Sequence, residues 1–376
     1  MFKYRNVISI PPLGMIDDLA AIARCGPESV VLNAVINAKM NLKKLEFNQT
    51  KCVKLHVCKE NKKKCSIAAT RNVGCVFLEV QDAEMQSAES EKYIGDVISS
   101  NGSNDANISR RVSIGYGAIS QIMAVLHEIS YGYQFVEIGL VMRESILLSK
   151  ILLSSESWHK LFLYQIEKLN DVDKSFFKNL FNSHSKTALE FYYSETGSIP
   201  LHIKISMRRL NYWWHILSVE NSEMISKIYN AQKLSPVSGD WTQLLEKDKK
   251  QFDIAEMTDS EVRAISQIKF KNFIKKKAQE LTVRYLVELK KKHSKSDKLD
   301  VKDLVISEYL IDKRFSKEER ELLFRLRSET VDVKETLKMH ISTTICCVSC
   351  VECFSAHKCI FSSAPNLPFL LWWTKM

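Results

Sequence analysis

The sequence predicts an α+β protein in which a short β-rich part is followed by a long, mainly helical part. Runs of β-favouring residues dominate the first 98 residues, together with one helical segment, Ser29 to Lys39, whose apolar positions recur at helical spacing. Past Ser99, apolar residues recur at three- and four-residue intervals between clusters of Asn, Asp, Gly, Ser and Pro, which is typical of amphipathic helices. The chain has 376 residues, of which 45% are hydrophobic, so it has room for two or three domains with a sizeable core.

Changes of composition divide the chain into four expected segments. The β-rich part covers residues 1–98, and a first helical region covers residues 99–235. A basic helical region is expected over 236–332, and a Cys-rich tail with little order over 333–376.

Two adjacent carboxylates, Asp17 and Asp18, lie within Gly14–Leu19 near the start of the chain. Apolar runs precede and follow them, Val7–Ile10 and Leu19–Ala23, so the pair is expected at the tip of a hairpin. Neighbouring side chains of an extended strand point to opposite faces, and only a turn would bring both carboxylates to one hard cation. An ordinary polar turn is the alternative interpretation.

Helix starts can be recognised from capping residues. Asn104 or Asn107 is expected to cap the helix that carries Ile108, and Thr258–Glu261 has the pattern of a capping box. The longest apolar stretch, Phe135–Leu153, contains four charged residues and is therefore expected to be a buried or half-buried helix rather than a membrane span.

Three ordered motifs resemble one family. After Asp17 and Asp18 come an Asn-x-x-Lys-Cys element at 48–52 and Tyr93-Ile94-Gly95. This succession resembles the palm of the reverse transcriptases of non-LTR (LINE-type) retrotransposons, in which an Asp-Asp box is followed by a helix, by an Asn-x-x-Lys element and by a Tyr-Leu-Gly strand at the primer grip. The resemblance extends through the following helices to about residue 335. It implies a palm remnant, then a helical thumb and a helical C-terminal region.

The resemblance also implies roles for single residues. Asp17 would be the stronger and Asp18 the weaker ligand of catalytic Mg²⁺, because nucleotidyl transfer uses two divalent ions held by several carboxylates. Lys51 would lie near the incoming triphosphate, although a surface lysine is an equal alternative. Tyr93 and Gly95 would contact nucleic acid, and the expected partners are RNA and DNA.

The chain departs from the family at a decisive place. The family has a further palm aspartate and a nucleotide-binding fingers region, both of which would lie before Met1. A two-carboxylate remnant cannot form the metal cage, so we expect an RNA-directed DNA polymerase fragment that is inactive alone. The alternatives are a basic nucleic-acid-binding helical protein without catalysis, or a translated relic without function.

Basic residues favour a polyanionic partner. The formal net charge is +10, and between Lys269 and Lys298 basic residues far outnumber acidic ones. The lysines are expected on the solvent side of a helix, as a phosphate-binding face or simply as a solvated face. The same holds for Arg208 and Arg209, which precede aromatic residues expected to belong to the core. The apolar face is expected to consist of Ile268, Phe273, Ile274, Leu281, Leu286 and Leu289, and the candidate phosphate contacts include Lys271, Lys275 and Lys276.

The ten cysteines include a cluster in the tail. Cys347, Cys350, His357 and Cys359 are ligand types that Zn²⁺ prefers, but their spacing is short for a folded zinc loop, so reduced and loosely ordered thiols are favoured over zinc. The first residues lack the long apolar region of a secretory leader. We therefore expect an intracellular protein, nuclear or cytoplasmic, with reduced thiols and no membrane partner.

Overall fold

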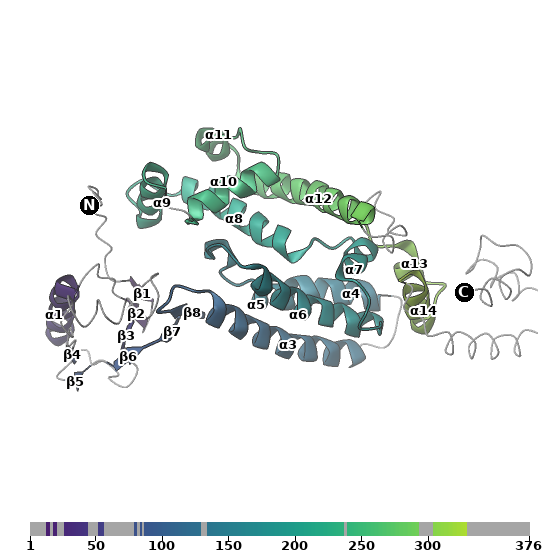
Figure 1. Ribbon diagram of the computed structural model, residues 1–376, viewed down its shortest axis with the longest axis horizontal. Coiled ribbons are helices and arrows are strands. Elements are labelled where there is room, and N and C mark those ends of the chain that lie inside the picture. Colours follow the sequence, from purple (N-terminus) through teal and green to yellow (C-terminus); the bar gives the residue numbers. More distant parts are fainter. Residues whose placement is uncertain are drawn as a thin grey trace, which may run out of the picture. The chain divides into compact units, whose positions relative to one another are not determined.

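The computed structural model describes residues 13–15, 18–20, 26–43, 52–55, 79–80, 83–84, 86–128, 134–236, 239–292 and 304–328 (Figure 1). Over these residues the chain is mostly helical, and every described strand ends before residue 100. The expected α+β mixture, with helices after Ser99, is confirmed at this level.

Asp18 begins the second strand of a hairpin. Strand β1 (Leu13–Met15) pairs antiparallel with β2 (Asp18–Ala20), and Met15 lies opposite Asp18. The predicted hairpin is confirmed by this register. Asp17 lies outside the described residues.

The remaining strands before residue 89 follow a helix in sequence and form two short pairs. Helix α1 (Gly26–Leu42) contains the predicted segment Ser29 to Lys39. Later in the chain, β3 (Val53–Leu55) pairs in parallel with β6 (Gln86–Ala88), and β4 (Glu79–Val80) pairs antiparallel with β5 (Ala83–Glu84).

A tight hairpin leads into the helical part. Strands β7 (Ser90–Tyr93) and β8 (Asp96–Ser99) are antiparallel, with Tyr93 opposite Asp96. The two turn residues, Ile94 and Gly95, have φ of 46° and 86°, and two positive φ angles match the right-handed twist of the strands. The resemblance implies a strand that includes Gly95, whereas β7 ends at Tyr93 and Gly95 belongs to the turn.

The chain divides into two compact units, each built from separate stretches of sequence. Unit 1 comprises residues 1–118, 146–172 and 199–282, and unit 2 comprises 119–145, 173–198 and 283–376. This division cuts across the four linear segments expected from the sequence, which stay a prediction. The described helices from residue 105 onward are α3 (Asp105–Glu128), α4 (Phe135–Met142), a π-helix (Arg143–Leu147), α5 (Leu148–Ile151), a 3₁₀ turn (Ser155–Ser157), α6 (Leu163–Phe181), α7 (Leu189–Thr196), α8 (Leu201–Ser218), α9 (Met224–Leu234), α10 (Trp241–Gln251), α11 (Asp259–Ala264), α12 (Gln267–Lys292), α13 (Glu308–Ile311) and α14 (Lys317–Arg327).

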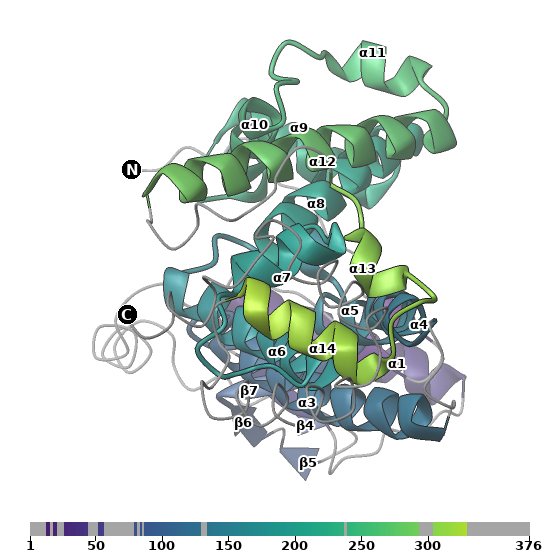
Figure 2. The same cartoon turned by 90° about the vertical axis from the view of Figure 1, so that its right-hand side faces the viewer.

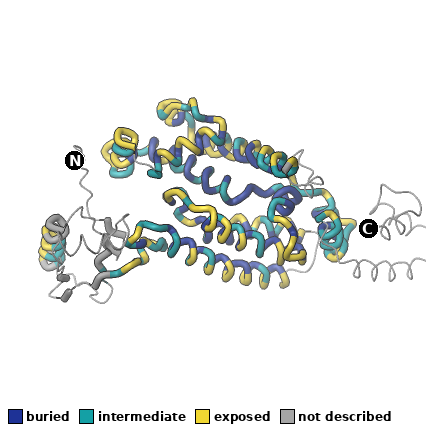
Figure 3. Tube along the Cα trace, in the orientation of Figure 1, coloured by how far each residue is buried: buried dark blue, intermediate teal, exposed yellow. Residues whose placement is uncertain are grey.

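Helix α8 is central to unit 1. It contacts α9, α10 and α11, and most of its length is buried or half-buried (Figure 3). Trp213 of α8 is fully buried and meets Phe270 of α12 edge to face, with ring centroids 6.3 Å apart. Its indole N–H donates to Asp259 at the start of α11. Trp213 therefore joins α8 to α11 and α12 in one core.

Aromatic rings build the core of unit 2. Phe324 of α14 stacks on Phe181 of α6, with centroids 4.4 Å apart, and on Tyr192 of α7. Phe177 stacks on Tyr192 as well. All four rings are 1% exposed or less. The three helices α6, α7 and α14 lie side by side in Figure 2, as these contacts require.

A close backbone approach attaches the chain before α13 to the end of α7. Gly197 follows α7 with φ of 63°, and a Cβ there would lie 2.9 Å from the carbonyl oxygen of Leu304. The backbone N–H of Ser307 donates to the carbonyl of Glu195 at 2.8 Å. Glycine at 197 thus permits both the left-handed turn and the contact with residue 304.

Other helix predictions are confirmed with changes of detail. The Phe135–Leu153 stretch is helical from 135 to 151, with a π-helical turn at 143–147. The Thr258 capping box is present. Helix α3 begins at Asp105, so Asn104 precedes it, whereas Asn107 lies inside the helix and bonds the β7–β8 hairpin. Among the described helices, none is long and apolar enough to cross a membrane.

Candidate nucleic-acid interface

Helix α12 carries a row of exposed lysines. Lys269, Lys271, Lys275 and Lys276 are all exposed, and they occupy the first three turns of the helix. The same turns bury Phe270, Ile274 and Ala278, each at 0% exposure. One side of the helix is therefore fixed in the core of unit 1, while its ammonium groups face solvent.

The apolar face of α12 differs from the expected one. Ile268 is 73% exposed and Phe273 is half-buried, whereas the buried side includes Phe270 and Ala278, which were not expected there. Phe270, Ile274 and Ala278 are spaced four residues apart, so they line one side of the helix. Ile268 precedes Phe270 by two residues, which places it on the opposite side of the helix. The expectation that Ile268 belongs to the apolar face was therefore wrong.

Arg208 and Arg209, neighbours on α8, lie in different environments. Arg209 is 5% exposed, and its guanidinium forms an ion pair with Asp248 of α10. Ser206 donates a second hydrogen bond to Asp248, at 2.8 Å. This geometry commits Arg209 to joining α8 to α10, so it does not favour the expected phosphate contact.

Arg208 is half-exposed and nearer the surface. Its Nη1 donates to the carbonyl of Leu152 at 2.6 Å and lies 3.9 Å from a carboxylate oxygen of Glu156. Its side chain is 34% exposed. A second partner could reach Arg208, although part of its bonding capacity is already used within unit 1.

Burial dominates the protonation of Asp248. It raises the pKa of this carboxyl above its usual range, and the Arg209 guanidinium opposes that rise only in part. An ion pair in such a place is a structural element, because separating either partner would leave a buried charge or an unsatisfied donor.

Of the three aromatic residues beside the two arginines, Trp213 belongs to the core, as expected, and Tyr212 and Trp214 are half-buried. Trp213 is fully buried, and Trp214 is half-buried with its indole N–H donating to the carbonyl of Ile265 at 2.8 Å. Tyr212 meets Trp241 edge to face. These rings are occupied by protein contacts.

A second basic group, which the sequence does not predict, lies around the β7–β8 turn. The carbonyl of Gly95 accepts hydrogen bonds from Arg110 at 3.1 Å and Arg111 at 2.8 Å. Arg111 also pairs with Asp96 at 2.6 Å and is buried, whereas Arg110 is half-buried. Tyr93 is half-buried at the end of β7. In the sequence, the only indication of this contact between helix and turn is the adjacent pair Arg110 and Arg111 within an expected helix.

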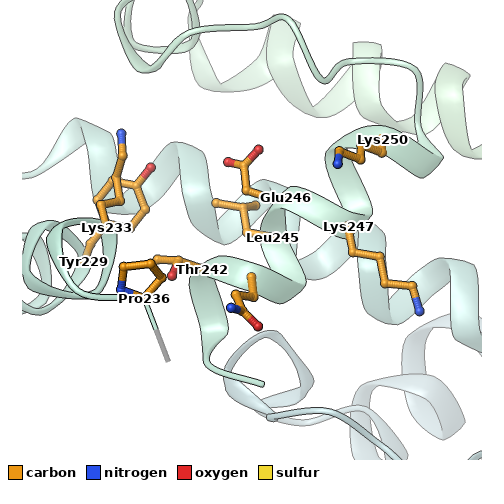
Figure 4. A pocket seen from close by; sticks show the side chains of 9 residues that line it. Tyr229, Lys233, Pro236, Thr242, Leu245, Glu246, Lys247 and Lys250 are labelled. Carbon is orange, nitrogen blue, oxygen red and sulfur yellow. The ribbon is translucent and has the colours of Figure 1, made fainter. Parts of the chain in front are cut away.

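An open hollow of about 610 Å³ lies beside α9 and α10 (Figure 4). Its lysines do not converge: Lys233 pairs with Asp259 at 2.7 Å, and Lys247 and Lys250 point in different directions. Without a set of polar groups aimed at one point, the hollow lacks the features of a specific ligand site. The lining residues are Tyr229, Lys233, Pro236, Thr242, Gln243, Leu245, Glu246, Lys247 and Lys250.

Most of the expected metal ligands, and also Lys51, lie outside the described residues. Asp17 and Lys51 lie outside the described residues, and Asp18 is described only as part of the backbone of β2. Cys347, Cys350, His357 and Cys359 also lie outside them. In the portion that the structure describes, no group of three or more His, Cys, Asp or Glu side chains is arranged to hold a metal ion.

Comparison with known proteins gives no match to a family model, a curated protein or a solved structure.

Proposed function

We propose that this chain binds RNA or DNA through the lysine row of α12 and does so without polymerising nucleotides by itself. The observation that carries the proposal is the exposure of Lys271, Lys275 and Lys276 on a helix whose other side is fixed in the core. A rigid row of cations binds a polyanion at a lower entropic cost than the same charges on a loose tail.

The net charge of the chain supports the same partner. With a formal charge of +10, the protein attracts polyanions from a distance, and the lysine row then supplies a local contact. The order of the Asp-Asp, Asn-x-x-Lys and Tyr-x-Gly motifs supports an origin in a non-LTR retrotransposon reverse transcriptase. In that setting α12 would belong to the region after the thumb.

The experiment replaces Lys271, Lys275 and Lys276 by Gln and measures the affinity for a labelled RNA and a labelled DNA duplex across a salt series. Each lost phosphate contact lowers the slope of log K against log salt by about 0.7 to 0.9, so a loss of roughly 2 to 3 is expected. Affinity at ~0.1 M salt should fall about a hundredfold or more, because log K falls linearly with log salt at the changed slope.

A matched control removes the same charge elsewhere. Lys178, Lys186 and Lys227 are also exposed, and their replacement by Gln gives the same net charge as the α12 variant. The control should keep a slope close to that of the unmodified chain. Equal losses in both variants would mean that only the net charge matters, and the proposed surface would then be wrong.

A further inference from the structure

Three consecutive large apolar side chains are exposed where α6 begins. Phe162 is 55% exposed, Leu163 72% and Tyr164 44%. The nearby residues Trp158 and Leu169 are buried in unit 1. A cluster of exposed apolar side chains beside a well-packed core indicates a binding surface.

Two of these side chains are arranged as parallel rings. The Phe162 and Tyr164 rings are stacked, with centroids 5.9 Å apart and planes 11° from parallel. Aromatic rings that are open to solvent offer the flat surface on which unpaired bases stack, whatever their sequence.

A hydrogen bond to another helix holds the Tyr164 ring in place. The Tyr164 hydroxyl donates to the carboxylate of Asp105 at the start of α3, as do Gln165 at 2.8 Å and Ser103 at 2.7 Å. These bonds, that of Tyr164 first, lower the pKa of Asp105 below its usual range. The Tyr164 ring is therefore oriented before any ligand binds, which reduces the entropic cost of binding.

Positive charge flanks the rings. The Nζ of Lys168 lies 5.6 Å from the centroid of the Tyr164 ring, and Lys160 is exposed just before Phe162. The nearby Asp105 carboxylate already accepts three hydrogen bonds within the protein. Aromatic rings with adjacent ammonium groups match a base and its phosphate better than they match an apolar protein surface.

We propose that Phe162 and Tyr164 form a stacking platform for the unpaired bases of a single-stranded nucleic acid. This inference rests on the proposed nucleic-acid binding and adds a preference to it: the lysine row binds phosphates of any strand, and the platform selects strands whose bases are free.

The test measures binding of a single-stranded oligonucleotide that carries 2-aminopurine, beside a fluorescein-labelled duplex of the same length. The unmodified chain should quench 2-aminopurine, because its fluorescence falls on stacking. Phe162→Ala should weaken single-strand binding about five- to one-hundredfold and reduce the quenching, while duplex affinity stays unchanged. Phe162→Leu, which keeps an apolar side chain without a ring, should behave like Phe162→Ala.

Controls separate the possible outcomes. Tyr116, another exposed aromatic residue of unit 1, provides a matched variant, Tyr116→Ala, that should keep single-strand affinity. If Phe162→Ala keeps its affinity and quenching while the α12 lysine variant loses salt dependence, the platform is refuted and the proposed function stands. If the unmodified chain binds no nucleic acid at low salt, both are refuted. If Phe162→Ala changes only self-association in sedimentation, the surface is a protein contact and the platform is refuted.

Discussion

Arg143 and Asp173 form an ion pair that is fully buried in unit 2. Two guanidinium nitrogens of Arg143 donate to Asp173, at 2.7 and 2.6 Å, and the Tyr193 hydroxyl donates to the same carboxylate at 2.9 Å. Burial alone would lower the pKa of Arg143, but the Asp173 charge raises it above its ordinary value. Removing either partner of such a pair costs about 3 to 5 kcal/mol, because the other charge is left buried.

His202 makes stability depend on pH. Burial lowers the pKa of this side chain to about 4, from an ordinary value of 6.5. Between these values the unfolded chain binds a proton that the folded chain does not, so the free energy of unfolding should fall as pH drops from about 6.5 to 4 and then level off. We expect His202 to contribute a loss on the order of 3 kcal/mol over this range.

Urea unfolding at a series of pH values measures this effect. His202→Gln should flatten the dependence between pH 6.5 and 4, whereas His215→Gln, which removes an exposed histidine of the same helix, should leave it in place. A slope that is the same in both variants and in the unmodified chain would assign the pH dependence to other groups.

At the scale of single elements, two helices begin with complete capping boxes. In α14, the Ser316 hydroxyl accepts from the N–H of Glu319, and the Glu319 side chain accepts from the N–H of Ser316. Ser316→Ala should lower the free energy of unfolding by about 0.5 to 2 kcal/mol, measured by urea denaturation. The same helix carries Phe324, which is fully buried in the core of unit 2.

Ser307 supplies the control. It occupies the same capping position before α13 but makes no side-chain cap hydrogen bond there. Ser307→Ala should change stability by less than about 0.5 kcal/mol. An equal loss for Ser307→Ala and Ser316→Ala would show that the cap bond is not the cause.

The sequence predicted helix positions better than helix faces. Thr258 marked the start of α11 because a capping box is local in sequence, and Ser29–Lys39 had a clear helical period. The buried side of α12 depends on the neighbour it meets: Phe270 faces inward because Trp213 of α8 is there. No local pattern reveals that partner, nor the ion pair that removes Arg209 from the surface.

At the scale of the whole molecule, the net charge favours nucleic-acid binding, whereas polymerisation makes a separate demand for metal-binding carboxylates. The net charge of +10 favours binding to a polyanion, whereas polymerisation needs a cage of several carboxylates around two metal ions. Asp17 and Asp18 are the carboxylates that the resemblance assigns to this cage. The activity that we propose from the charge is nucleic-acid binding.

Primer extension on an RNA template tests this prediction. With Mg²⁺ or Mn²⁺ and all four deoxynucleotides, the purified chain should leave the primer unextended while still retarding the template in a gel. Extension above background that Asp17→Ala abolishes would contradict the prediction and assign catalysis to these residues. A complete reverse transcriptase provides the positive control for template and primer.

The turn between β7 and β8 lowers the stability of the folded chain below what another residue at position 94 would permit. Ile94 is a β-branched residue held at φ of 46°, a conformation that costs an L-residue about 1 to 2 kcal/mol, and its side chain is 46% exposed. The bonds of Arg110 and Arg111 to Gly95 hold the turn closed against that cost. Evolution or design can therefore gain stability here by a single surface change to Asn or Gly, with no repacking of the interior.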